Sequence, residues 1–454
     1  MKKLTVLNVG KSHCISAAIR RSKHLNKLYV VNATTSPGLE EAADDVIIGD
    51  TKDPKFVAEN AKRLGVDLAI IGSEEPLSKG VVDALNSVGV RCVGPTKNLA
   101  KLESSKSFTR KLLSDHEIPG NPEYRVFSSM DGLPEYLESL TEFVVKPDGL
   151  TGGKGVQVFG DHFNTSAAAA DYCRQLFENG EPVVIIEEKL DGEEFSFQSF
   201  WDGHHIAHTI PVQDHKRAFP DDTGPNTGGM GSYSCSNHLL PFLTSEQIAE
   251  AGRINTLVGE ALLKETGQEF KGILYGGFML TKSGLRVIEY NARFGDPEVM
   301  NVLTLLKTDF LEICQSIVDG TLDKLHVEFA NQATVCKYVV PEGYPVNSKD
   351  AVGSAIDLSG ALNSAELNKR LRMYYAAVDS AGGQIRLTDS RSVAFVGIGE
   401  TLAEAERIAE AAAASVKGRV FHRSDIGTPK LIQKRIDHME RIWDSESKAK
   451  RRFA

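Results

Sequence analysis

Short apolar runs alternate with amphipathic stretches over the first ninety residues of the chain. The runs near Leu4, Leu28, Val46 and Leu68 have the length of buried strands. Between them lie stretches with helical spacing, such as residues 53–64. Regular alternation of strands and helices predicts a doubly wound parallel sheet, in which ligands bind where strands end.

The pattern changes after residues 117–122, which contain two prolines. Residues 401–418 have an alanine-rich helical pattern, and the tail from Lys430 has the pattern of a charged helix, for which a solvated surface helix is favoured over a partner site. These changes predict an N-terminal α/β domain at 1–119, a lid at 120–190, a core at 191–328, a C-terminal domain at 329–428 and a helical tail at 429–454.

Composition narrows the function classes. The chain has 454 residues, of which 41% are hydrophobic, enough to form buried cores. Its net charge of -9 argues against binding to nucleic acid or to an anionic membrane. No apolar run approaches the roughly 18 residues of a membrane span. Six scattered cysteines without a CxxC pair fit reduced thiols. We therefore expect a multi-domain cytoplasmic enzyme, monomeric or homodimeric, that acts on small molecules.

The segment 212–234, VQDHKRAFPDDTGPNTGGMGSYS, concentrates charges and glycines. Both signs of charge stand side by side at residues 214–217, and the glycines and prolines that follow interrupt regular hydrogen-bond ladders. The pattern predicts a functional loop. A solvated surface loop is about equally compatible with this composition alone.

A second segment, VIEYNARFGDPEVMNVL at 287–303, indicates a cation site. The end of a buried strand delivers Glu289 and Asn291 two residues apart, so both side chains leave the same face. A carboxylate and an amide oxygen suit magnesium, which takes few protein ligands and leaves the rest to water and phosphate. Arg293 offers a planar fork for a carboxylate or a phosphate. The alternative is a strand edge with a surface ion pair.

A third segment, residues 143–159, has two apolar strands around a glycine-rich turn that contains Lys154, with Lys146 at the end of the first strand. Glycines let the backbone approach phosphate oxygens, which the lysines neutralise. The strand 183–190 follows, and its last residues can offer backbone groups to an adenine, with Glu194 placed for a ribose hydroxyl. Together they predict a nucleotide cleft with a hairpin lid.

In this order and spacing the motifs resemble the ATP-grasp ligases, and within them the phosphoribosylamine-glycine ligase family. The resemblance rests on SSKSFTRKLL, KPDGLTGGKGV, IEEKLDGEEFSF, QDHKRAFPDDTGPNTGGMGSYS and IEYNARFGDPE. It implies an α/β ATP-grasp fold with a small C-terminal α+β domain. It also implies a ligase of purine biosynthesis that uses ATP and Mg²⁺ or Mn²⁺ to join glycine to 5-phosphoribosylamine through a glycyl phosphate.

The resemblance assigns roles to individual residues. Those implied to contact ATP are Lys106, Lys146, Lys154, Glu187, Glu188, Leu190 and Glu194, and those implied to hold the metal are Glu289 and Asn291. Asp214 would meet the glycine amine and Arg293 its carboxylate, and these two with Lys154 would be catalytic. The substrate-binding set is Gly10, Lys11, Asp214, His215, Lys216, Arg217, Asn226, Thr227, Gly228, Gly229 and Arg293.

The N-terminal turn departs from the family pattern GxGGREHA. It is about two residues shorter and keeps Gly10 and His13, with Lys11 as a possible substitute phosphate partner. This departure leaves open an ATP-grasp ligase that acts on a different amine. A non-catalytic nucleotide-binding paralogue is the remaining alternative, disfavoured because the charged residues of the site are all present.

Overall fold

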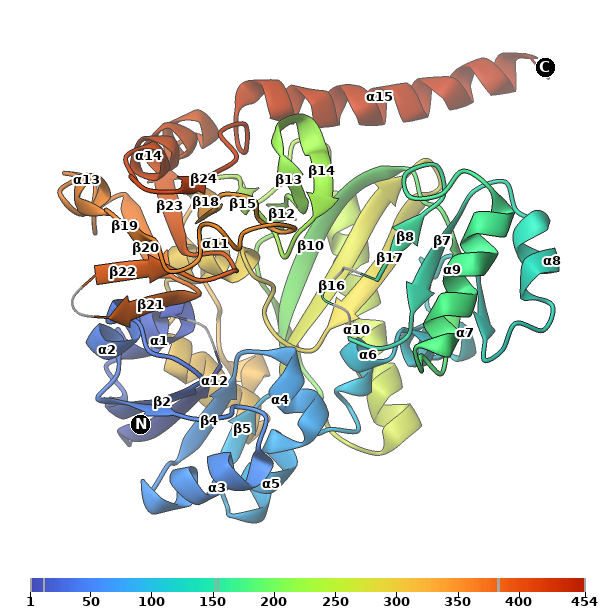
Figure 1. The fold of residues 1–454 in the computed structure, drawn as a ribbon. Helices are drawn as coiled ribbons and strands as arrows, with labels where there is room; N and C mark the ends of the chain where they lie inside the picture. The colour runs from blue at the N-terminus through green and yellow to red at the C-terminus, as the bar shows by residue number, and fades with distance from the viewer. Residues whose placement is uncertain (1, 11–12, 151, 153–154, 382–383, 453–454) are drawn as a thin grey trace.

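The computed structural model describes residues 2–10, 13–150, 152, 155–381 and 384–452, with side chains up to residue 444 except that of Ala381. The N-terminal part, drawn in blue in Figure 1, lies below the central sheet, and the lid lies to the right of that sheet. The C-terminal part, in orange and red, lies above the N-terminal part.

The N-terminal sheet contains five parallel strands in the order β3-β2-β1-β4-β5. They are β1 (Leu4–Val9), β2 (Leu25–Asn32), β3 (Asp45–Ile48), β4 (Leu68–Ile71) and β5 (Arg91–Val93). The helices between them are α1 (His13–Arg20), α2 (Pro37–Ala42), α3 (Pro54–Arg63), α4 (Glu74–Lys79) and α5 (Val81–Ser87). The predicted strands and the helix at 53–64 are confirmed; the side chain of Asp53 caps α3 by accepting hydrogen bonds from two backbone N–H groups.

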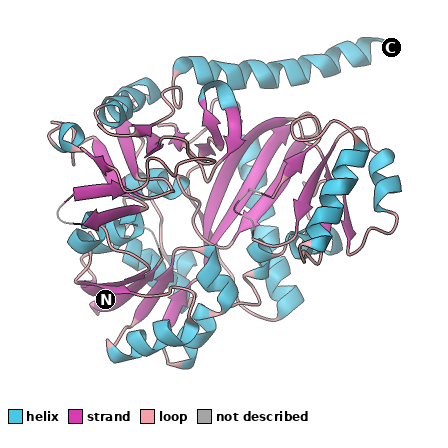
Figure 2. Cartoon of the chain, in the orientation of Figure 1, coloured by secondary structure: helices cyan, strands magenta, loops and turns pink. Residues whose placement is uncertain are grey.

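The lid has its own four-stranded sheet, in the order β6-β9-β7-β8. Its elements are β6 (Tyr124–Phe127), α8 (Leu133–Glu138), β7 (Phe143–Pro147), β8 (Gln157–Val158), α9 (Ser166–Glu178) and β9 (Val184–Glu188). The antiparallel pairing of β7 with β8 confirms the predicted hairpin. Helices α8 and α9 lie on one side of this sheet (Figure 2) and enclose a separate apolar core.

The central sheet is antiparallel, in the order β11-β10-β16-β17. Its strands are β10 (Gly192–Trp201), β11 (Ile206–His208), β16 (Gly272–Thr281) and β17 (Gly284–Asn291). Helix α10 (Ser245–Thr266) packs so closely against it that a Cβ on Gly259 would lie 2.5 Å from the Trp201 ring. Two short helices, α6 (Lys101–Ser104) and α7 (Lys106–Asp115), lead from the N-terminal part into the lid.

Helices that follow the central sheet pack on the N-terminal part. They are α11 (Glu298–Leu305) and α12 (Phe310–Asp319), whereas the short η2 (Leu322–Lys324) contacts α12 and β11. Arg91 forms an ion pair of 2.6 Å with Asp319, and His24 lies 2.8 Å from the Glu312 carboxylate. These contacts attach α12 to the N-terminal part.

The segment 212–234 is not the loop that its composition predicts. It contains β12 (Gln213–Asp214), β13 (Arg217–Phe219), the turn η1 (Pro220–Asp222), β14 (Thr223–Asn226) and β15 (Gly231–Ser234). Strand β13 pairs with β14, and β12 with β15. Glycines do not prevent these short ladders because Gly224 and Gly229, with φ of 80° and 106°, stand outside the paired positions or at turns between them.

Strand β15 joins this segment to the C-terminal sheet, whose order is β12-β15-β18-β23-β20 with β24 also on β18. The C-terminal elements are β18 (Ala333–Pro341), β19 (Ala355–Ile356), α13 (Ser359–Leu362), β20 (Leu371–Tyr375), β21 (Val378–Ala381), β22 (Gln384–Leu387), β23 (Val393–Gly399), α14 (Leu402–Ala414) and β24 (Val420–Phe421). Strands β19, β22 and β21 form a separate three-stranded sheet. The predicted alanine-rich helix is α14.

The tail forms α15 (Pro429–Arg452), which confirms the helix. The prediction that it is a solvated surface helix is wrong for its first half. Leu431 and Met439 are buried there, and Ile442 is 9% exposed. These residues recur at helical spacing, so an apolar stripe faces the protein and the charges surround it.

All six cysteines are free thiols. Within the part of the chain that the structure describes, no helix is long and apolar enough to cross a membrane.

Gly397 tests the contact between α14 and β23. A Cβ there would lie 2.0 Å from the Ala405 carbonyl oxygen, so Gly397→Ala must displace the helix and should cost about 3 kcal/mol of unfolding free energy. Urea unfolding measures it. Gly149→Ala is the control, since a Cβ there meets no atom within 4 Å. Equal stability of the two variants would contradict the close packing.

Candidate active site

Glu289 lies at the centre of the site, on β17. Register pairs Glu289 with Gly277 and Asn291 with Tyr275, which places both side chains on one face as predicted. Among the described residues neither side chain makes a hydrogen bond. Burial alone would raise the pKa of Glu289, but Lys216, Lys146 and Lys106 outweigh it and lower the pKa. An ionised carboxylate beside an amide oxygen therefore fits a hard cation.

Lys146 is held by a buried carboxylate. Its ammonium donates to Glu187 at 2.7 Å, and Arg110 holds the same carboxylate through two hydrogen bonds of 2.8 Å. Burial alone would raise the pKa of Glu187, but Arg110 and Lys146 lower it to about 2. The carboxylate of Glu187, predicted to contact ATP, thus orients Lys146.

Arg110 was not predicted. It also donates to the carbonyls of Val287 at 3.0 Å and Ile288 at 2.7 Å, so one guanidinium connects α7, the lid and β17. The only signal in the sequence is its place one helical turn after Lys106.

Lys106 anchors the start of the glycine-rich turn. Its ammonium donates to the carbonyls of Pro147 at 3.0 Å and Gly149 at 2.8 Å, and burial lowers its pKa. Asp148 accepts hydrogen bonds from the Ser105 hydroxyl and from the backbone N–H of residue 107. Lys154, predicted in the same turn, lies outside the described residues.

The remaining predicted nucleotide residues follow β9. The Glu188 carboxylate accepts a hydrogen bond of 3.0 Å from the Glu123 backbone N–H, and Leu190 lies between β9 and β10. Glu194, predicted for a ribose hydroxyl, lies on β10 and forms an ion pair of 2.9 Å with Lys216. This ion pair connects β10 to residues 212–234, the predicted substrate segment.

Asp214 and Lys216 lie together on the segment 212–234, where the Asp214 side chain is 8% exposed and that of Lys216 is 37% exposed. The Lys216 ammonium lies 3.9 Å from the Asp214 carboxylate. Burial raises the pKa of Asp214, and Lys216 opposes this effect. Burial would lower the pKa of Lys216, but Asp214 and Glu194 outweigh it and raise the pKa well above its usual value. Lys216 is therefore a permanent cation between two acids.

Arg293 lies where the central sheet meets the N-terminal part. Its guanidinium pairs with Glu74 at 3.2 Å and Glu103 at 2.9 Å. Burial raises the pKa of Glu103 to about 7 although Arg293 opposes the shift. Glu74 begins α4, after the end of β4, where strand-end ligands were expected. Arg293 is thus a cation whose partners belong to another part of the fold.

The glycine-rich turn of the substrate segment is fastened by an arginine that was not predicted. Arg391 donates to the carbonyls of Gly228 at 2.7 Å and Gly229 at 3.1 Å, and pairs with the Asp296 carboxylate at 3.0 Å. Thr227 accepts a hydrogen bond from the Gly229 N–H through its hydroxyl. Arg391 comes from the C-terminal domain and contacts both residues 228–229 and Asp296, so it joins the predicted substrate segment to the segment 287–303.

His215 is buried, with no hydrogen-bond partner for either ring nitrogen among the described residues. Burial lowers its pKa to about 3, so the ring is neutral near pH 7.

Arg217 points toward the lid, where it pairs with Asp161 at 2.8 Å, and Asn226 lies opposite it in the β13–β14 pair.

At the N-terminal turn, Gly10 has a φ of 113° and a Cβ there would lie 2.7 Å from the Ser73 hydroxyl. The turn therefore requires glycine for both conformation and space. Lys11, the predicted phosphate partner, lies outside the described residues.

Glu298 is a further acid that sequence reasoning missed. It is buried and accepts a hydrogen bond of 2.8 Å from the Tyr275 hydroxyl. Burial, reinforced by Asp214, raises its pKa to about 7. It belongs to the DPE motif, but nothing in the sequence distinguishes it from an ordinary helix-opening glutamate.

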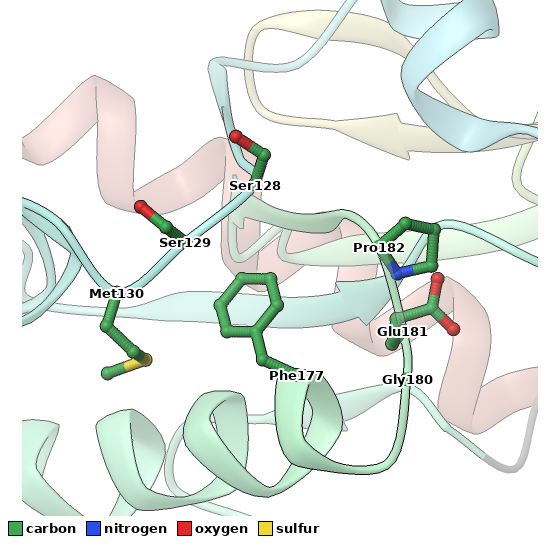
Figure 3. A pocket seen from close by; sticks show the side chains of 7 residues that line it. All are labelled: Ser128, Ser129, Met130, Phe177, Gly180, Glu181 and Pro182. Atoms are coloured by element: carbon green, nitrogen blue, oxygen red, sulfur yellow. The ribbon is translucent and has the colours of Figure 1, made fainter.

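A separate hollow of about 460 Å³ lies in the lid (Figure 3), lined by Ser128, Ser129, Met130, Phe177, Gly180, Glu181 and Pro182. None of the predicted binding residues lines it, and its wall carries no cation for phosphate. It is distinct from the site on the central sheet.

Family models for phosphoribosylglycinamide synthetase match three consecutive regions: the N domain at residues 1–103, the ATP-grasp (A) domain at 104–299 and the C domain at 334–429. The chain belongs to this family. A phosphoribosylamine-glycine ligase of Methanocella arvoryzae is 44% identical over 443 residues, which cover 97% of this chain and all of that protein. The ligase of Methanoregula boonei is 46% identical with the same coverage.

Solved structures agree on the fold. A phosphoribosylamine-glycine ligase of Thermotoga maritima superposes with a TM-score of 0.77 at 23% identity, covering 93% of this chain and all of that one. A biotin carboxylase of Campylobacter jejuni gives 0.72 at 13% identity, covering 96% and 98%. The predicted ATP-grasp fold with an N-terminal parallel sheet and a C-terminal domain is confirmed.

The family models assign the predicted site residues to two domains. The predicted ATP and metal residues all lie within the matched ATP-grasp domain, whereas Gly10 and Lys11 lie in the N domain. An ATP-grasp enzyme of this family uses ATP and a divalent metal. The individual residue roles and the predicted domain limits stay predictions.

The Glu187 ion pairs predict that the unmutated chain is more stable than a Glu187→Gln variant, by an amount that depends on pH. Glu187→Gln leaves Arg110 and Lys146 without a buried counter-charge and should cost about 3–5 kcal/mol at neutral pH. Because the folded pKa is about 2, below the usual value of 4.5, the stabilisation is complete above pH 4.5 and is lost toward pH 2. Urea unfolding from pH 3 to 7 should therefore show the difference shrinking as pH falls.

The control is Glu188→Gln, which should cost about 1 kcal/mol because its carboxylate accepts a single backbone hydrogen bond. A cost for Glu187→Gln that is equally small, or that grows on acidification, would contradict the buried ion pairs.

Proposed function

We propose that this chain is an ATP-dependent ligase that joins glycine to 5-phosphoribosylamine, giving glycinamide ribonucleotide, ADP and phosphate. Family membership supports the reaction. The observation that carries it is the convergence on Glu289, whose pKa responds to charges from Lys216, Lys146, Lys106 and Arg293. These groups come from separate segments of the chain, and they supply the charges that phosphoryl transfer to a carboxylate requires.

The chemistry has two steps. A glycine carboxylate oxygen attacks the γ-phosphorus of ATP, the bond to the β-γ bridging oxygen breaks, and ADP leaves a glycyl phosphate. The amine of phosphoribosylamine then attacks the glycyl carbon, loses a proton, and phosphate departs. Neither step needs an enzyme nucleophile, so catalysis consists of positioning and charge neutralisation.

Glu289 and Asn291 would hold the metal, for which magnesium is proposed and manganese is the alternative. When bound, the ion neutralises phosphate charge during transfer. The residues fit because one carboxylate and one amide oxygen leave the same face, and neither makes a hydrogen bond to another of the described residues. Lys106 and Lys146 hold the nucleotide phosphates, and Lys154 is proposed to join them.

Glycine is placed between the substrate segment and Arg293. Asp214 is proposed to accept a hydrogen bond from the ammonium, and Arg293 to bind the carboxylate with the part of its fork not engaged by Glu74 and Glu103. The substrate segment from His215 to Gly229 would contact phosphoribosylamine together with the Gly10 turn. Small-molecule substrates follow from the family; a monomer or homodimer and a cytoplasmic location stay predictions.

An assay of ADP release tests the proposal. The purified chain is incubated with ATP, magnesium and glycine, and scanned across phosphoribosylamine and amines without the ribose phosphate. ADP and glycinamide ribonucleotide should form in equal amounts with phosphoribosylamine. Turnover with another amine alone would favour the second ligase, which the shortened N-terminal turn motivates, and no turnover with any amine would favour a non-catalytic protein.

Glu289→Gln should remove most of the activity. The amide lacks the negative charge that a divalent ion needs, and losing one such group costs about 3–4 kcal/mol, roughly 100- to 1000-fold in kcat. Steady-state rates over a magnesium titration measure the effect, with Glu181→Gln in the separate lid hollow as control. Near-normal turnover of Glu289→Gln at low magnesium would contradict the metal assignment.

Asp214→Asn should raise the KM for glycine by about 10-fold or more and change the KM for ATP much less, because it deletes a charge-assisted hydrogen bond to the ammonium. Initial rates with each substrate varied in turn separate the two constants. The exposed Asp171→Asn on α9 is the control. A rise confined to the KM for ATP would move Asp214 to the nucleotide subsite.

A further inference from the structure

Helix α15 covers the back of the substrate segment. Figure 1 shows it crossing above β13 and β14, and Figure 2 shows it as one continuous helix. Leu431 and Met439 are 2% and 1% exposed, so this half of the helix is part of the packed protein. The polar side chains of its inner face therefore have defined partners.

Arg435 is the first of these side chains. Its guanidinium lies 2.6 Å from the Asp222 carboxylate and 3.4 Å from that of Glu193. Asp222 ends the η1 turn of the substrate segment and also pairs with the buried Arg423 at 3.1 Å. Arg435 is 15% exposed, so these charges interact with little screening by water.

His438 is the second. Its Nδ1 lies 2.7 Å from the Glu193 carboxylate, and its Nε2 lies 3.2 Å from that of Asp191. Glu193 also accepts a hydrogen bond of 3.3 Å from the Gln213 amide, which donates to the Glu194 carbonyl at 2.9 Å. Glu193 therefore connects α15 to both strands that carry the site.

The contacts of Glu193 and Gln213 also affect the opposite faces of β10 and β12. Glu193 and Gln213 are buried against each other on the side of α15, and successive residues of a strand point to opposite faces. The next residue of β10 is Glu194 and the next of β12 is Asp214, the two acids on either side of Lys216. Restraining residues 193 and 213 restrains residues 194 and 214.

We propose that Arg435 and His438 are positioning residues for the amino-acid subsite. They act through Glu193 and Asp222, and they hold Asp214 and Lys216 in the geometry that binds the ammonium of glycine. The proposal rests on the proposed function for the identity of that ligand. Residues that orient metal ligands without touching the metal commonly change affinity or activity 10- to 100-fold when mutated, and we expect an effect of the same order here.

Kinetics of Arg435→Gln test the proposal. The KM for glycine should rise about 10-fold while the KM for ATP changes less than about 3-fold, since the nucleotide lysines have other anchors. Arg441→Gln is the matched control, because on the same helix its Nε donates to the Asp437 carbonyl within α15. Equal behaviour of the two variants, or a fall in kcat with both KM values unchanged, would overturn the proposal.

A double-variant cycle identifies the path. Glu193→Gln should raise the KM for glycine much as Arg435→Gln does, and the double variant should be no worse than the worse single variant within about 2-fold. Multiplication of the two single effects would mean that Arg435 does not act through Glu193, and would reject that path.

Hydrogen exchange separates this proposal from the proposed function. Arg435→Gln should speed amide exchange in residues 213–227 while the N-terminal sheet exchanges as before, whether or not the chain uses glycine. An unmutated chain that releases no ADP with glycine and phosphoribosylamine would reject the ligase. Unchanged exchange in residues 213–227 would instead reject the role of α15.

Discussion

The ion pairs of the buried Glu187 carboxylate connect the parts of the nucleotide site. Arg110 and Lys146 compensate its charge, and Arg110 also binds the backbone of the strand that carries Glu289. Burying a carboxylate without such partners would cost several kcal/mol, so the lid, α7 and β17 are stabilised in one arrangement. Lys146 is thereby held in a fixed position, as the proposed catalysis by charge neutralisation requires.

The substrate segment depends on a different set of contacts. Its strand β15 lies in the C-terminal sheet, Arg391 fastens its glycine turn, and α15 lies behind its acids. The segment is therefore shared between the ATP-grasp and C-terminal domains. With the proposed residue roles, this arrangement gives the C-terminal domain a direct part in substrate binding, although the residues predicted to bind nucleotide and metal all lie in the ATP-grasp domain.

Periodicity predicted the parts of this fold that local sequence determines. The parallel strands, helix α3, the β7–β8 hairpin and the shared face of Glu289 and Asn291 follow from spacing alone. The residues that were missed, Arg110, Glu298 and Arg391, gain their roles from partners far away in the chain, and such contacts leave no periodic pattern. Residues 212–234 were predicted as a loop because glycine content was weighed above pairing with a distant strand.

In the proposed function, this site activates a carboxylate by phosphorylation before the amine attacks. Glycine labelled with ¹⁸O in both carboxyl oxygens, incubated with ATP, magnesium and phosphoribosylamine, tests it through the ³¹P NMR isotope shift of the released phosphate. A glycyl phosphate that breaks at its carbon–oxygen bond leaves one labelled oxygen in each phosphate, and we expect this result. Phosphate without label, formed together with glycinamide ribonucleotide, would contradict it.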